Sequence, residues 1–276
     1  MKFDLDTAWR DAKRFAGANS GLLSAIAGIF VFLPYAILLV TLPSFAPMPE
    51  IPEGASMERV MDAFNAFYAR TWWLFMLVAA IGTVGQLAML ALVGRRASPT
   101  VSEAIGIGAK FFVPAWLALV LQMLGINFAT LLIVSVATLT GLGGVAFAAT
   151  VLAFAVAVYL TARLSMTLPI FAVDGEINPI AALRGSWNMT RGNGRRLSFF
   201  YFLLVVAAFA LFIVVLLVSG LILSLTGPAV AEVGEAVTMA AMTTAVVVGA
   251  TAVLAAVHRQ FRRLENATSV PTVRHD

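Results

Sequence analysis

The sequence has no cysteine and only two histidines among its 276 residues. The lack of cysteine excludes disulfide bonds, thiolate nucleophiles and cysteine-ligated metal sites. The chain also lacks the phosphate-binding pattern GxxxxGK[ST], the zinc-protease pattern HExxH and the hydrolase pattern GxSxG. We therefore predict no ATP-driven motor, no metal or other cofactor, and no catalytic residues.

Charge is scarce as well, because only 12% of the residues are charged whereas 61% are hydrophobic. Soluble domains carry about a quarter charged residues. A mean hydropathy of +0.95 favours the lipid bilayer as the solvent for this chain. The net charge of +4 could suggest nucleic acid. The basic residues flank apolar runs and form no separate basic domain, so we expect no nucleic-acid partner.

Long stretches without any charge predict the membrane-spanning helices, each of which needs about 20 apolar residues. The first run, 15–49, is longer than the apolar region of a signal peptide, so we expect it to be a retained span. The run 111–162 is long enough for two spans, separated by a turn at Thr138–Gly144. The sequence thus predicts an all-α integral membrane protein, with residues 1–276 as a single membrane domain. Its six spans are expected at 20–43, 71–94, 112–137, 143–163, 198–224 and 236–258.

The distribution of lysine and arginine predicts the orientation, because cytoplasmic loops carry an excess of these residues. If the N-terminus is inside, only Arg59 and Arg70 fall on the outer side. The opposite orientation would place nearly every basic residue on the wrong side. We therefore expect both termini to be cytoplasmic.

Short amphipathic segments precede the predicted hairpins. They cover 4–16, 98–110 and 178–191, and they predict three hairpins, each with a cytoplasmic interfacial helix. Ser98 is expected to cap the second segment, and Asn178, followed by Pro179, to cap the third. A further amphipathic segment at 56–70 is expected on the outer face or against the bundle.

A cluster of arginines and one tryptophan surrounds the start of the fifth span. Tryptophan at headgroup level and arginines that reach phosphates are typical of interfacial helices. These residues either hold the inner end of the span or bind anionic lipid or another anionic ligand. The candidates are Arg163, Arg184, Trp187, Arg191, Arg195 and Arg196.

Two acids lie in the same loop, at Asp174 and Glu176. Carboxylates two residues apart could serve acid–base chemistry or a metal ion. A turn at Val173–Glu176 is the simpler interpretation, with Asp174 paired to Arg163 or Arg184. His258 is expected to be an interfacial residue without a partner.

Three uncharged polar residues fall within predicted spans, namely Gln86, Gln122 and Asn127. Hydrogen bonds between helices would explain them. They could instead line the cavity of a transporter or permease subunit for a small solute or a lipid-derived metabolite.

The stretch from Arg163 to Gly192 resembles a bacterial inner-membrane family related to the membrane domain of glycerophosphoryl diester phosphodiesterases. That family shows R-x-x-x-x-L-P followed by P-x-x-A-L-x-x-S-W-x-x-T-R-G before a span. The residues that match are Arg163, Leu168, Pro169, Pro179, Ala182, Leu183, Ser186, Trp187, Thr190, Arg191 and Gly192. The opening AWRDAKRFAGAN is also similar to the start of that family.

The resemblance implies a six-span module of the bacterial inner membrane. Some relatives are attached to a soluble phosphodiesterase barrel, of which this sequence shows no sign, so we expect no hydrolase activity. The leading hypothesis is a non-enzymatic membrane module that engages anionic lipid, or another membrane protein, through its Trp/Arg segment. The transporter subunit is the alternative.

Overall fold

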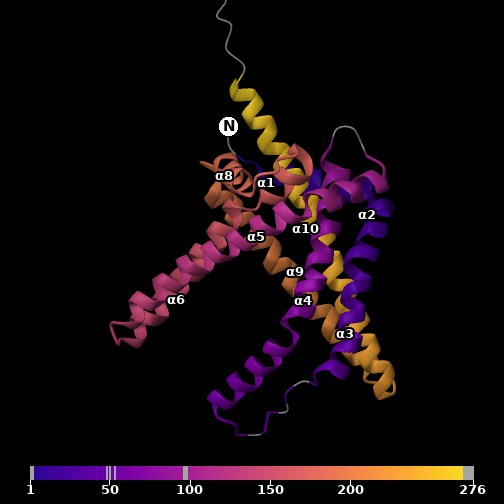
Figure 1. The fold of residues 1–276 in the computed structure, drawn as a ribbon, viewed down its shortest axis with the longest axis vertical. Helices are drawn as coiled ribbons and strands as arrows, with labels where there is room; N and C mark the ends of the chain where they lie inside the picture. Colours follow the sequence, from indigo (N-terminus) through magenta and orange to yellow (C-terminus); the bar gives the residue numbers. More distant parts are fainter. Residues whose placement is uncertain (1–2, 48, 50, 53, 96–98, 270–276) are drawn as a thin grey trace, which may run out of the picture.

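The computed structural model describes residues 3–47, 49, 51–52, 54–95 and 99–269. Within these ranges the chain is almost entirely helical and contains no strand (Figure 1). The elements are α1 (Leu5–Ala18), α2 (Ser20–Ala27), the π-helical turn η1 (Gly28–Phe32), α3 (Leu33–Phe45), α4 (Met57–Gly94), α5 (Val101–Thr138), α6 (Gly143–Arg163), α7 (Thr167–Pro169), the π-helical turn η2 (Ile170–Asp174), α8 (Pro179–Met189), α9 (Gly194–Leu223) and α10 (Pro228–Ser269).

Among the described residues, six helical segments are long and apolar enough to cross a membrane, which confirms the predicted all-helical class and the multi-pass character. Each predicted span overlaps one of them: Ser20–Phe45, Met57–Gly94, Val101–Thr138, Gly143–Asp174, Gly194–Leu223 and Pro228–Asn266. The turn predicted between the third and fourth spans is also present, because α5 ends at Thr138 and α6 begins at Gly143.

Two predicted amphipathic segments are not separate helices. The segment 56–70 is the first part of α4, which is capped by Ser56 and continues without a break to Gly94. The segment 98–110 is the start of α5, where the capping residue is Thr100, in a reciprocal capping box with Glu103. Ser98 lies outside the described residues. A lone charge such as Lys110 does not interrupt backbone hydrogen bonding, so both helices run on into their spans.

The third segment is a separate helix with the predicted cap. The Asn178 side chain accepts hydrogen bonds from the backbone N–H groups of Ile180 and Ala181, and Pro179 occupies the first helical position. The first segment forms α1, which packs on α10 through Ala8, Ala12 and Phe15. Trp9 of the same helix is exposed, with the Lys13 ammonium 5.6 Å from the centre of its ring.

The core lies around the second half of α4, where every residue from Leu87 to Ala91 is fully buried. Helix α5 approaches this segment closely at Gly108, since a Cβ there would lie 2.5 Å from the Val84 carbonyl oxygen. Helix α10 packs against α4, α1 and α9. Side chains from five elements thereby converge at one end of the molecule.

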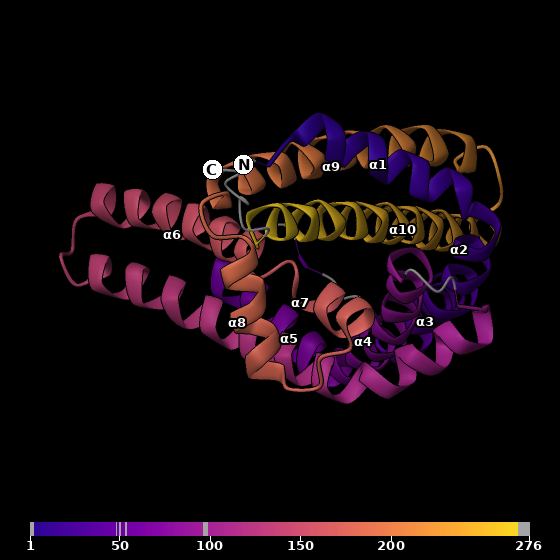
Figure 2. The same ribbon diagram turned by 90° about the horizontal axis from the view of Figure 1, so that it is seen from above.

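That end also carries α1, α8 and the end of α10 (Figure 1). Seen from above, these elements surround the α4–α10 contact, whereas α5 and α6 extend sideways as a pair (Figure 2). The connections before α4, between α5 and α6, and between α9 and α10 lie at the opposite end (Figure 1). We refer to the first as the terminal end and to α6 together with the second half of α5 as the arm.

Candidate functional site

Arg163 does not face the lipid, because its side chain is buried at the terminal end with only 5% of the residue exposed. One terminal nitrogen donates a hydrogen bond of 2.6 Å to the Trp187 carbonyl oxygen. The guanidinium carbon also lies 4.0 Å from the centre of the Trp187 ring. Such a desolvated cation–π contact contributes about 2 kcal/mol. Arg163 therefore fastens α8 to the end of α6.

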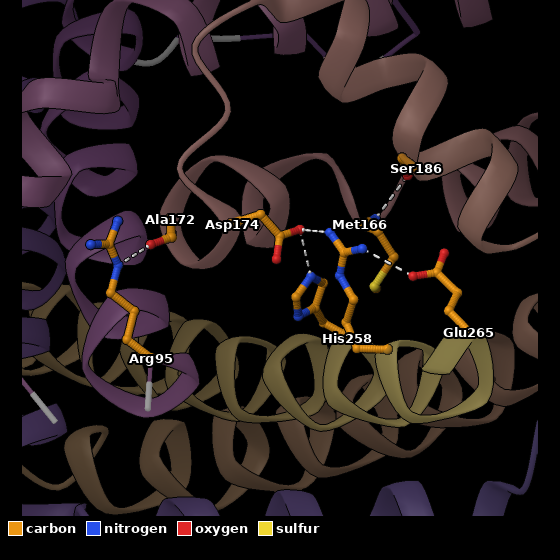
Figure 3. A network of polar contacts seen from close by, with 8 residues as sticks. Arg95, Met166, Ala172, Asp174, Ser186, His258 and Glu265 are labelled. Atoms are coloured by element: carbon orange, nitrogen blue, oxygen red, sulfur yellow. Dashed lines mark hydrogen bonds and ion pairs between the residues drawn. The ribbon is translucent and has the colours of Figure 1, made fainter. Parts of the chain in front are cut away.

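The backbone of Arg163 takes part in the same connection. Its carbonyl oxygen accepts hydrogen bonds from the hydroxyls of Ser186 and Thr190, at 3.0 and 3.1 Å. The Ser186 hydroxyl in turn accepts from the N–H of Met166 at 3.1 Å (Figure 3). Ser186 and Thr190 are fully buried. We call Arg163, Ser186, Trp187 and Thr190 the clamp, because together they tie α8 to the chain that leaves α6.

Arg196 contacts the N-terminal segment. It donates a 3.4 Å hydrogen bond to the Phe3 carbonyl oxygen, and the Phe3 N–H donates to Asn193 at 2.9 Å. The Phe3 ring packs against Phe200 and Phe261, with ring centres 5.8 and 5.5 Å apart. This contact closes the terminal end between α1, α9 and α10.

The other predicted arginines remain at the surface. Arg184, Arg191 and Arg195 are exposed, and none of them forms an ion pair with a described residue. On α8, Arg184 lies on the same outward face as Ile180 and Trp187, which are 52% and 40% exposed. The opposite face of α8 is buried through Ala182, Ser186 and Met189.

A polar cluster that the sequence reading missed lies beside the clamp. The Asp174 carboxylate bonds to His258 Nε2 at 3.0 Å and forms an ion pair with Arg262, which also pairs with Glu265 at 2.9 Å (Figure 3). The prediction that Asp174 pairs with Arg163 or Arg184 is therefore wrong. The expectation that His258 has no partner is wrong as well.

The spacing of His258 and Arg262 held the only signal for this cluster. Residues four apart share one helix face, so α10 presents both toward the same neighbour. That neighbour is Asp174, which lies 84 residues away in the chain, and no sequence pattern predicts the pairing. The predicted turn at Val173–Glu176 is present, with Gly175 in the left-handed conformation at φ +79°. The Glu176 carboxylate caps this loop by accepting from the N–H groups of Ile177 and Asn178.

Two cavities open on either side of this cluster, and Asp174 and Arg262 line both of them. The larger has a volume of about 680 Å³ and lies between α1, the end of α4, η2 and α10. The smaller, of about 470 Å³, lies between the loop at Glu176, α8 and the end of α10. The cluster is the wall that separates them.

Residues 144–260 match the membrane domain of glycerophosphoryl diester phosphodiesterase. This match confirms the resemblance noted from the sequence, and it concerns a membrane domain, not a catalytic one. No curated protein and no solved structure matched the chain.

The match to the phosphodiesterase membrane domain covers α6 through most of α10, and so contains the whole clamp together with Asp174 and His258. Arg95, Arg262 and Arg263 lie outside it. The motif residues Arg163, Ser186 and Thr190 make contacts within the protein, so much of the motif has a structural role.

The three polar residues predicted inside the spans are not gathered around the two cavities. The Asn127 amide donates to the Met123 carbonyl of its own helix at 2.8 Å, and the residue is exposed. Gln122 is half-buried, and its carbonyl oxygen has no partner among the described residues. Five residues on a helix correspond to a rotation of about 140°, so these two side chains face different sides of α5. Gln86 lies on α4 and is half-buried.

Proposed function

We propose that this chain is a non-enzymatic membrane module that engages anionic lipid through the outward face of α8 and the arginines that follow it. The observation that carries the proposal is the division of the predicted basic cluster. Arg163 is buried in the clamp, whereas Arg184, Arg191 and Arg195 remain exposed. Arg163, Ser186 and Thr190 thus hold α8 in place, while Ile180, Arg184 and part of Trp187 stay exposed.

The composition of that face supports lipid as the partner. Ile180 and Trp187 are apolar or amphipathic and exposed, and Arg184 lies between them on the same helix face. Interfacial helices place such side chains into the headgroup region, where guanidinium groups meet phosphates. The helix lies next to the ends of α6 and α9, both of which are apolar enough to be membrane spans.

The arrangement of the helices supports the predicted sidedness. Both α1 and the end of α10 lie at the terminal end (Figure 1). Most arginines and lysines also belong to the segments gathered there, whereas Arg59 and Arg70 lie on the opposite half of α4. In the bacterial inner membrane, the positive-inside rule then makes the terminal end cytoplasmic, with three helical hairpins pointing away from it.

The test is the lipid retained by the full chain when it is extracted in native lipid discs. Mass spectrometry would compare the wild type with Arg184→Gln/Arg191→Gln and with Arg59→Gln/Arg70→Gln. Both variants lose two positive charges from exposed positions, but only the first alters the α8 region. We expect the first to lose retained anionic phospholipid several-fold while the second keeps the wild-type profile. Identical profiles for all three proteins would refute the proposal, as would equal losses in both variants.

A further inference from the structure

We propose that the larger cavity is a binding site for a phosphate-bearing ligand, held by Arg95 and Arg259. This site is separate from the outward face of α8 and does not depend on the function proposed above. Its apolar wall is formed by Phe15, Val93 and Ala255, and the cavity volume is about 680 Å³.

The charge of the cavity is strongly positive. Four arginines and His258 line it, against the single carboxylate of Asp174. That carboxylate is already bonded to His258 and Arg262, and Arg262 also pairs with Glu265. Arg263 lies 3.8 Å from Asp11. In the part of the chain that the structure describes, the remaining two arginines, Arg95 and Arg259, have no acidic partner.

Neutral groups hold both of these arginines in place. Arg95 Nε donates a 2.7 Å hydrogen bond to the Ala172 carbonyl oxygen, so η2 fixes the guanidinium (Figure 3). The Arg259 guanidinium carbon lies 4.8 Å from the centre of the Phe15 ring. A carbonyl and an aromatic face leave the positive charge intact, and they leave the other N–H donors available. The site is therefore preorganised for an anion that the described residues do not supply.

A phosphate group suits this arrangement. Guanidinium groups bind phosphate oxygens in a bidentate manner, and two of them match its double charge. The volume exceeds the space that one phosphate group fills, and the apolar wall offers contact for the organic part of the ligand. Phosphatidic acid, whose headgroup is a phosphomonoester, and a soluble phosphomonoester share this chemistry.

The experiment measures phosphate binding to the full chain in discs of phosphatidylcholine. In one arm the probes are inorganic phosphate and butyl phosphate in solution, followed by calorimetry. In the other arm the discs contain a minority of phosphatidic acid, and native mass spectrometry counts the lipid that stays bound. Saturable binding in the first arm indicates a soluble ligand, and binding confined to the second indicates a lipid.

Three variants decide the assignment. Arg95→Gln/Arg259→Gln should weaken binding about tenfold or more, which corresponds to a loss of about 1.4 kcal/mol or more. Arg259→Gln alone should weaken it several-fold, and it is a safe variant because the residue is exposed and such substitutions rarely affect folding. The control Arg59→Gln/Arg70→Gln, with the same change in net charge at exposed positions of α4, should bind as the wild type does. The proposal is overturned by the absence of saturable binding in both arms, by unchanged binding of Arg259→Gln, or by equal weakening in the control. The function proposed for α8 is tested by a different variant, Arg184→Gln/Arg191→Gln, so either proposal can fail without the other.

Discussion

Helix α5 has a different environment in each of its halves. In the first half, Ala104, Gly108, Phe111, Ala115 and Ala118 are buried against the rest of the protein. In the second half, large apolar side chains such as Leu124, Phe128 and Leu131 are more than 60% exposed. The first half is positioned by the protein, whereas the second half and α6 form the arm (Figure 2).

The difference shows which forces act in each region. Exposed leucine and phenylalanine cost little in a bilayer, because lipid tails are as apolar as a protein core. The arm therefore needs few protein contacts. At the terminal end, by contrast, buried polar groups such as the Ser186 and Thr190 hydroxyls must be satisfied within the protein. Substitutions should consequently be costly at the terminal end and tolerated in the arm.

The largest contrast is expected between two glycines of α5. A Cβ at Gly108 would lie 2.5 Å from the Val84 carbonyl oxygen and 3.2 Å from the Ala88 nitrogen, which are backbone atoms that cannot turn aside. Gly108→Ala should destabilise the protein by about 3 kcal/mol. Gly125 has open space around it, so Gly125→Ala should stabilise by about 0.5 to 1 kcal/mol through helix propensity. Unfolding titrations with sodium dodecyl sulfate would measure both, and equal effects would contradict the comparison.

A smaller loss of stability is expected when Arg163 of the clamp is replaced. Arg163→Leu removes the hydrogen bond to the Trp187 carbonyl and the contact with the Trp187 ring. We expect a destabilisation of about 2 kcal/mol. Arg195→Leu removes the same charge from an exposed position and serves as the control, with an expected change within about 0.5 kcal/mol. The same unfolding assay compares the two, and a stable Arg163→Leu variant would disprove the anchoring role.

The Ser186 hydroxyl should contribute less to the stability of the protein than the Arg163 side chain does. Ser186→Ala leaves the Met166 N–H without its hydrogen-bond partner and removes one of the two donors to the Arg163 carbonyl. We expect a loss of about 1 to 1.5 kcal/mol. In the control Ser198→Ala, the hydroxyl bonds only to the Gly194 carbonyl within its own helix, so little change is expected. Faster hydrogen exchange at the Met166 amide in Ser186→Ala alone would confirm the local origin of the effect.

The smallest effect concerns the cap of α1 and depends on pH. The backbone N–H of Thr7 donates to the Asp4 carboxylate and lowers the pKa of that carboxyl below its usual value. A lowered folded-state pKa means that the cap stabilises α1 above the pKa of the unfolded chain. This contribution is lost as the pH falls through the folded-state pKa. The protection of α1 amides, measured as the intrinsic exchange rate at each pH divided by the observed rate, should therefore fall on acidification in the wild type. In Asp4→Asn, which keeps a cap without a titrating group, the loss of protection due to this carboxyl should be absent.

Much of the architecture was predictable because it depends on local composition. Charge-free runs long enough to cross the hydrocarbon indicate spans wherever they occur, and Asn178 with Pro179 marks a helix start by its own chemistry. The helix bounds were less predictable. The segments 56–70 and 98–110 differ in composition from the spans that follow them, but the backbone continues through both without a break.

The candidate site divides in the same way. The sequence by itself determined an all-helical chain with six apolar helices and a basic segment around α8, because hydrophobic length and charge are properties of neighbouring residues. Only the tertiary structure decided which arginines are available. It buried Arg163 in the clamp and joined Asp174 to His258, 84 residues away. It also left Arg95 and Arg259 beside one cavity. Burial and pairing depend on which helices meet, and that choice comes from the fit of distant surfaces, which no local pattern encodes.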